Sequence, residues 1–158
     1  MKKVSLILAF LSLAVIGCNN KNEAETANKN TEVELEVDKK NNQINNNWLS
    51  EIQLNNGSKW IANAETTDGV VQMLSIVKST KTTTVADFHD LAAQLNDVKN
   101  YIVKECTMEG SSHDNLHIFL HPLIEKINAL GAISAVDEGT KIKRAIQENL
   151  TAYYNYFE

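Results

Sequence analysis

Residues 84–102, TVADFHDLAAQLNDVKNYI, decide the fold class of this chain. Their apolar residues recur at intervals of three and four positions, the spacing that places side chains on one face of an α-helix. These positions are Val85, Phe88, Leu91, Ala92, Leu95, Val98 and Ile102. Because the stretch Thr84-Val-Ala-Asp87 is similar to a capping box, we predict that an amphipathic helix starts here.

Three further stretches carry the same helical period. The first covers about residues 67–78, the second starts near Ser111 and ends at Gly131 with an expected left-handed cap, and the third opens at Ser134. Short connections between such helices favour antiparallel neighbours. The sequence therefore predicts a mainly α fold, an antiparallel four-helix bundle.

The segment that precedes these helices, residues 48–61, has the pattern of a short β-hairpin. A two-residue turn at Asn56-Gly57 would mix the two faces of the hairpin. A three-residue loop through Ser58 would place Leu54 opposite Trp60 and keep one face apolar. We therefore expect the longer loop, with an irregular lead-in that covers the bundle as the alternative.

Residues 1–17 have the pattern of an export signal. Lys2 and Lys3 form a basic start, residues 4–16 form an apolar run too short to span a membrane, and Gly17 precedes Cys18. The run Val15-Ile-Gly-Cys18 resembles the lipobox of bacterial lipoproteins. This resemblance implies that residues 1–17 are a lipoprotein signal peptide, that Cys18 is acylated, and that its lipid anchors the mature chain.

Two more parts follow the signal peptide. Residues 18–47 are mostly Asn, Lys, Glu and Thr, a composition that cannot bury enough apolar surface to fold, so we predict a disordered, lipid-anchored tether. Residues 48–158 have the length of one small domain and form the predicted helical bundle. We expect an outer-membrane anchor in the cell envelope, with the bundle facing the periplasm or the exterior.

The net charge of the chain limits the classes of partner that it can bind. The formal net charge is −5, and loss of the signal peptide removes Lys2 and Lys3, which makes it −7. An acidic surface without a basic cluster argues against nucleic acid and against electrostatic docking to anionic lipid. The expected partners are the bilayer, through Cys18, and an envelope protein or copper-transfer protein.

Residues 106–121 concentrate the side chains that bind metals: Cys106, Met108 and three histidines, His113, His117 and His121. Histidines four positions apart lie along one ridge of a helix, so one such pair can share an ion. His113 and His121 are two turns apart, roughly 12 Å by helix rise. We expect Cys106, Met108, His113 and His117 to form one site, and we expect His121 to lie outside it or in a second site.

A thiolate, a thioether and two imidazoles form a soft donor set that suits copper. Zinc, for which a thioether is a poor ligand, and a non-covalent haem held by Met108 and a histidine are alternatives. Glu109 and Asp114 could accept hydrogen bonds from the ligands. The predicted function is metal sensing, buffering or delivery. The alternative is a non-catalytic protein interaction module with no metal, in which Cys106 fills the core.

We do not expect an enzyme, because a Cys106–histidine dyad would have no third orienting group and no oxyanion loop. The string Cys-Thr-Met-Glu-Gly-x-x-His-x-x-Leu-His at residues 106–117 is similar to one in small envelope lipoproteins of Gram-negative bacteria. This resemblance supports the envelope location and the importance of the string, and it implies no activity.

Overall fold

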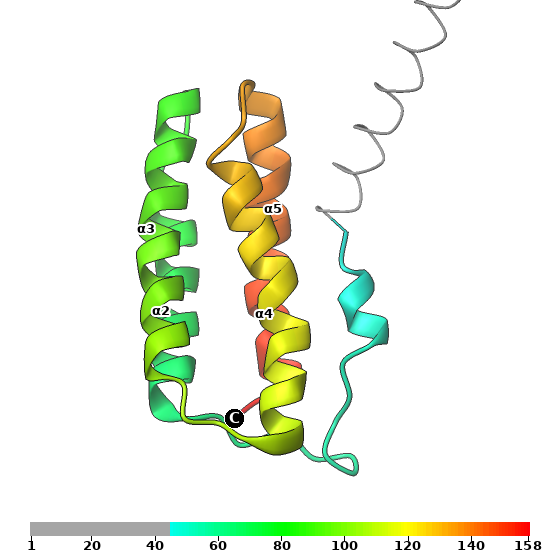
Figure 1. Ribbon diagram of the computed structural model, residues 1–158. Coiled ribbons are helices and arrows are strands. Elements are labelled where there is room, and N and C mark those ends of the chain that lie inside the picture. The colour runs from blue at the N-terminus through cyan, green and yellow to red at the C-terminus, as the bar shows by residue number, and fades with distance from the viewer. Residues whose placement is uncertain (1–44) are drawn as a thin grey trace, which may run out of the picture. The chain divides into compact units, whose positions relative to one another are not determined.

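The computed structural model describes residues 45–158, so the predicted signal peptide, Cys18 and most of the predicted tether lie outside the described residues. Four α-helices form a compact bundle (Figure 1). They are α2 (Ala64–Ser79), α3 (Val85–Glu105), α4 (Gly110–Leu130) and α5 (Val136–Ala152), flanked by the short 3-10 helices η1 (Asn47–Ser50) and η2 (Tyr153–Asn155). The predicted mainly helical bundle is confirmed. Within residues 45–158 no helix has the length and apolarity needed to cross a membrane.

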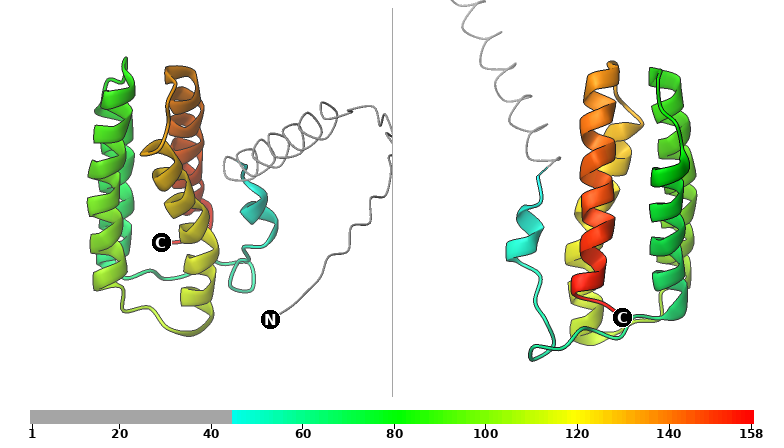
Figure 2. Two further views of the ribbon diagram at one scale, coloured as in Figure 1. Left: turned by 45° about the horizontal axis from the view of Figure 1, so that its top comes forward. Right: turned by 180° about the vertical axis from the view of Figure 1, so that it is seen from behind.

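The four helices are arranged as a ring, in which α2 packs against α3 and α5, and α4 packs against α3 and α5. The α3–α4 connection lies at the same end of the bundle as the C-terminus (Figures 1 and 2). The predicted apolar stripes fill the centre. The largest fully buried apolar side chains are Met73, Phe88, Leu91, Leu95, Ile102, Leu116, Phe119, Leu123, Leu130, Tyr153 and Phe157.

The capping box predicted at the start of α3 is confirmed. The Thr84 hydroxyl accepts a hydrogen bond from the backbone N–H of Asp87 at 3.2 Å, and the Asp87 carboxylate accepts one from the Thr84 N–H at 2.8 Å. Hydrogen bonds from the backbone N–H groups of Thr83 and Thr84 lower the pKa of Asp87 to about 2. The carboxylate therefore stays ionised and holds the first turn.

The end of α4 differs from the prediction. Gly131 has φ −72° and ψ −10°, so the expected left-handed cap is wrong. The last carbonyl groups are satisfied in another way, because the Gly131 N–H donates to Ile127 and the Ala132 N–H donates to Ala129. A right-handed turn therefore continues past the helix and needs no left-handed residue.

The lead-in is irregular, and among residues 45–158 it contains isolated β-bridges but no strand. The expected three-residue loop is wrong, because Asn55 and Ser58 exchange backbone hydrogen bonds across a two-residue turn. Asn56 and Gly57 both have positive φ, 52° and 89°, as this tight turn requires. The chain after the turn pairs instead with the C-terminus, since the Trp60 N–H donates to Tyr156 at 2.7 Å.

One lysine is buried among the apolar residues of α4. The Lys126 amine is inaccessible to solvent and donates to the side-chain oxygens of Asn46 at 2.8 Å and Asn149 at 2.7 Å. Burial lowers its pKa to about 8. Asn46, at the end of the segment predicted to be a tether, is therefore bound to the bundle.

Candidate functional site

The α3–α4 connection brings the predicted sulfur residues to the start of α4. Cys106 ends α3 in an extended conformation, and Glu109 precedes the first helical residue of α4. Gly110 has φ +60°, a left-handed conformation that glycine adopts without the Cβ clash of other residues. The tight reversal leaves Cys106 half-buried beside the first turns of α4.

His113, His117 and His121 form a continuous row on α4. The Nε2 atoms of His113 and His117 are 3.1 Å apart, and His117 Nδ1 is 3.0 Å from His121 Nε2. The successive rings meet edge to face, with centroids 4.4 Å and 4.9 Å apart. The predicted ridge is therefore present, and His117 contacts its two neighbours through different ring nitrogens.

This row requires a defined pattern of protons. A neutral imidazole has one donor nitrogen and one acceptor nitrogen, so three neutral rings can bond in sequence with all donors pointing one way. Burial lowers the pKa of His117, and the neighbouring His113 and His121 lower it further, while Asp114 opposes them. The lowered pKa favours the neutral form of the central ring, which is the form that binds metals.

Exposure changes along the row. His113 is half-buried, and both His117 and His121 are exposed. The histidines therefore lie on the flank of the apolar face of α4, and the later two are more exposed than the first. The ridge is accessible from solvent, and its first member borders the interior.

Cys106 joins the first two histidines at a small cavity of about 60 Å³. Its wall is otherwise apolar and comes from both α3 and α4. The lining residues are Ile102, Val103, Cys106, His113, Leu116, His117 and Leu120. Three of the predicted ligands therefore share one location, although they are separated in sequence by the turn between the helices.

These residues do not yet form a metal cluster. In the described part of the chain, no group of three or more His, Cys, Asp or Glu side chains is placed to hold one ion. Met108 is partly buried against the core and is not one of the residues that line the cavity. Glu109 and Asp114, the predicted outer acceptors, are exposed.

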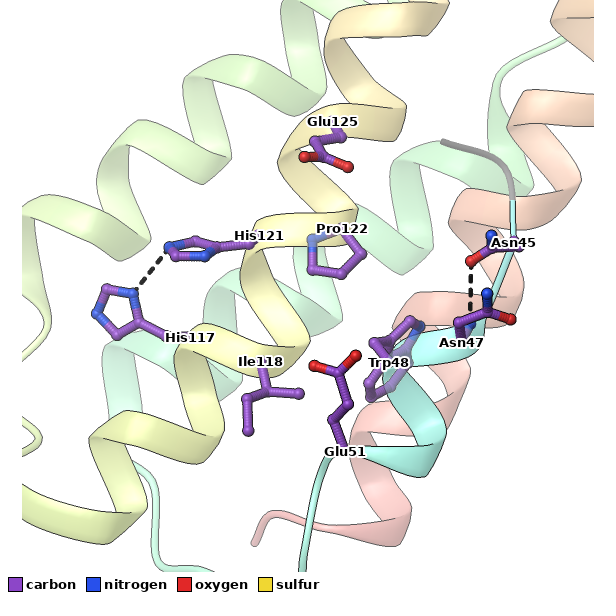
Figure 3. Close-up of a pocket in the computed structure, with 9 residues that line it drawn as sticks. All are labelled: Asn45, Asn47, Trp48, Glu51, His117, Ile118, His121, Pro122 and Glu125. Atoms are coloured by element: carbon purple, nitrogen blue, oxygen red, sulfur yellow. Dashed lines mark hydrogen bonds between the residues drawn. The ribbon is translucent and has the colours of Figure 1, made fainter. Parts of the chain in front are cut away.

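A second hollow, of about 320 Å³, lies on the other side of the ridge, between η1 and α4. Figure 3 shows the rings of His117 and His121 turned toward one another, with Glu125 further along α4 and Glu51 across the hollow. Neither carboxylate was predicted from the sequence. Glu125 lies four positions after His121, so extending the ridge by one step would have found it; Glu51 comes from the lead-in and carries no such signal.

The fourth histidine lies elsewhere. His89 is exposed on α3, and its Nε2 is 3.0 Å from the carbonyl oxygen of Ile133. This contact joins α3 to the segment between α4 and α5 and lies away from the histidine row. Substitution of His89 can therefore serve as a control for substitutions of the three histidines on α4.

Comparison with known protein families, curated proteins and solved structures found no match to this chain.

Proposed function

We propose that this protein is a lipid-anchored envelope protein whose helical bundle binds a soft transition metal, with copper the best match to the donors. Cys106, His113 and His117 are the proposed principal ligands, and Met108 and His121 are accessory ligands. The observation that carries the proposal is that the thiol and two imidazoles border one cavity at the α3–α4 turn. A soft thiolate beside neutral imidazoles favours copper over hard cations.

The spacing of the two imidazoles supports this proposal. An ion with metal–nitrogen bonds of about 2.0–2.1 Å separates two tetrahedral ligand nitrogens by about 3.3 Å. The Nε2 atoms of His113 and His117 are 3.1 Å apart. An ion can replace their hydrogen bond once both rings turn, so that the lone pairs of the two nitrogens converge on the ion and no longer lie along the line between them. The lowered pKa of His117 reduces competition from protons.

Coordination by the Cys106 thiol requires a larger movement than coordination by the two histidines. Cys106 borders the same cavity, but it does not form a cluster with the histidines. Coordination requires its side chain to turn toward His113.

The bundle and its anchor complete the proposal. The connections at residues 80–84, 106–109 and 131–135 are short, which supports antiparallel neighbouring helices. The lipobox-like run before Cys18 supports acylation there, with the bundle held close to an envelope membrane. A tethered soft-metal site in that position suits metal sensing, buffering or delivery to a partner protein.

Copper binding is tested on the whole chain carrying Cys18→Ser, which leaves Cys106 as the single thiol. The protein is titrated anaerobically with Cu(I) against a chromogenic chelator. We expect one equivalent to be withdrawn from the chelator, and we expect Cys106→Ser and His117→Ala each to weaken binding about tenfold or more. His89→Ala, which changes the one histidine outside the ridge, should leave the affinity unchanged.

Failure to compete with the chelator would contradict the proposal. So would binding that Cys106→Ser leaves intact, because the soft ligand would then have no part in it. Either result would leave the protein interaction module as the better account of the bundle.

The anchor has its own test. Cells expressing the whole chain are fed an alkyne-labelled fatty acid, and the protein is followed in membrane and soluble fractions. We expect label and membrane association to be lost together in Cys18→Ala, while Cys106→Ala retains both. Label that persists in Cys18→Ala would contradict acylation at this residue.

A further inference from the structure

We infer that the protein binds a neutral carbohydrate in a third hollow, of about 400 Å³, between the lead-in and the start of α4. The lead-in reverses direction in the turn from Asn55 to Ser58, close to the first residues of α4 (Figure 1). Both segments contribute side chains to the hollow. The inference goes beyond the proposed function, and it requires neither a metal nor the lipid anchor.

The side chains that line this hollow indicate the class of ligand. They are mostly neutral and polar: the amides of Gln53, Asn55, Asn56 and Asn115, the hydroxyl of Ser111 and the carboxylate of Asp114. Amides and hydroxyls both donate and accept hydrogen bonds, so together they match a ligand that presents many hydroxyl groups. None of the described residues that line the hollow is cationic, so a phosphate or another anion would find no opposite charge there.

Trp60 supplies the apolar surface that a sugar ring requires. It is half-buried and borders the hollow. The face of an aromatic ring is electrically negative and attracts partially positive C–H groups, which a pyranose ring presents on its flat faces. An aromatic side chain with a few convergent polar groups is the usual composition of a small-molecule site. The combination of one indole with several amides therefore favours a sugar over a purely polar ligand.

The Trp60 indole is fixed before any ligand binds. Its N–H donates to the carbonyl oxygen of Gln53 at 2.6 Å. The backbone of Trp60 is held as well, because its N–H donates to Tyr156 at 2.7 Å and its carbonyl oxygen accepts from Glu158 at 3.0 Å. A side chain that is already ordered loses little conformational entropy on binding.

Asn115 connects the two walls of the hollow. It is only 8% exposed, its side-chain oxygen accepts from the Gln53 N–H at 2.8 Å, and its amide nitrogen donates to the Ser111 carbonyl at 2.9 Å. A side-chain amide has two N–H groups and two lone pairs, and these contacts use one of each. The Gln53 backbone is thus held by Trp60 on one side and by Asn115 on the other. This arrangement fixes the lead-in against α4 and gives the hollow a defined shape.

The test titrates the whole chain carrying Cys18→Ser with chitotetraose and with cellotetraose, which share one glycosidic backbone and differ in their acetamido groups. The signal is the indole N–H resonance of Trp60 in NMR spectra, and the other tryptophan of the chain, the buried Trp48, is the internal reference. We expect at least one of the two sugars to bind with a Kd of about 1 mM and to shift the Trp60 resonance more than that of Trp48.

Three variants locate the site. Trp60→Ala should weaken binding about tenfold or more. Asn56 has φ +52°, so Asn56→Gly removes an amide and preserves the turn. This variant and Asp114→Ala should each weaken binding about threefold or more. Asp97→Ala and Asn100→Ala, which change exposed residues of α3, are the matched controls and should leave the affinity unchanged.

Two results would overturn the inference. One is the absence of any shift of the Trp60 resonance with either sugar. The other is an unchanged affinity in both Asn56→Gly and Asp114→Ala, which keep the contacts of Trp60 and so remain informative if Trp60→Ala does not fold. The sugar titration and the Cu(I) competition use different proposed ligand residues, so failure of one proposal leaves the other standing.

Discussion

The two faces of α4 differ in what they contribute to this protein. One face carries Leu116, Phe119, Leu123 and other side chains that are fully buried in the bundle, where α4 packs against α3 and α5. The flank of the same helix carries the histidine ridge, which is largely exposed and bonded mainly to itself. Both faces have a helical period, but only the apolar face buries the surface that stabilises the fold.

This difference implies that stability and chemistry can be changed separately on one helix. Truncation on the buried face leaves a cavity that the neighbouring helices fill only in part. Truncation of His117 or His121 on the ridge removes a side chain that is already exposed to water.

Leu123→Ala should lower the free energy of unfolding by about 2–5 kcal/mol, because Leu123 is fully buried at the centre of the bundle. His121→Ala, on the exposed flank nearby, should change it by less than about 0.5 kcal/mol. Urea unfolding followed by circular dichroism measures both. Equal losses in the two variants would show that the ridge is part of the folding core.

Lys126 is an exception to this difference between the two faces of α4, because it is a charged residue on the buried face. Its pKa is lowered to about 8 by burial, an effect that Glu148 and Glu125 oppose. Between pH 8 and 10.5 the unfolded chain therefore holds more protons than the folded one, so stability should rise with pH. The full rise corresponds to a pKa difference of about 2.5, on the order of 3 kcal/mol.

In Lys126→Met the part of this rise that Lys126 contributes should be absent, and Lys141→Met, which alters an exposed lysine of α5, is the control. Chemical denaturation at pH 7.5, 8.5 and 9.5 gives the comparison. The Lys143 pKa is also lowered by burial, but this contribution is common to all three proteins. Parallel pH profiles for the wild type and Lys126→Met would refute the assignment.

The smallest expected effect belongs to the ridge itself. Burial and the two neighbouring rings lower the pKa of His117, so the unfolded chain binds more protons than the folded one as the pH falls below about 6.5. Stability should therefore decrease with acidification through this window, and less so in His117→Gln. An NMR titration of the ring protons without metal gives the direct measurement, and a midpoint above 6.5 would contradict the prediction.

The sequence predicted the helices well because their signals are local. Thr84 and Asp87 are close enough along the chain to form a capping box, and the stripe from Phe88 to Ile102 needs only the helical period. The lead-in was predicted less well. Its apolar alternation indicated a hairpin, whereas Trp60 pairs with residues near the C-terminus.

The candidate site was predictable in part. The spacing of His113, His117 and His121 determines a ridge on any helix that contains them, and the structure confirms that ridge. The spacing does not reveal which nitrogen faces which neighbour. It also does not place Cys106 beside His113, since that proximity depends on the turn at Gly110.

The sequence by itself thus determined a helical bundle, the ridge of histidines and the concentration of soft ligands near the α3–α4 turn. Only the tertiary structure decided that Cys106 shares a cavity with two histidines, that Glu125 and Glu51 line a hollow beside His121, and that Lys126 is buried against Asn46. The physical reason is the distance along the chain between the residues that interact. Periodicity and capping depend on neighbours within a few residues, while cavities, buried charges and the opposition of two walls depend on segments that meet only when the chain has folded.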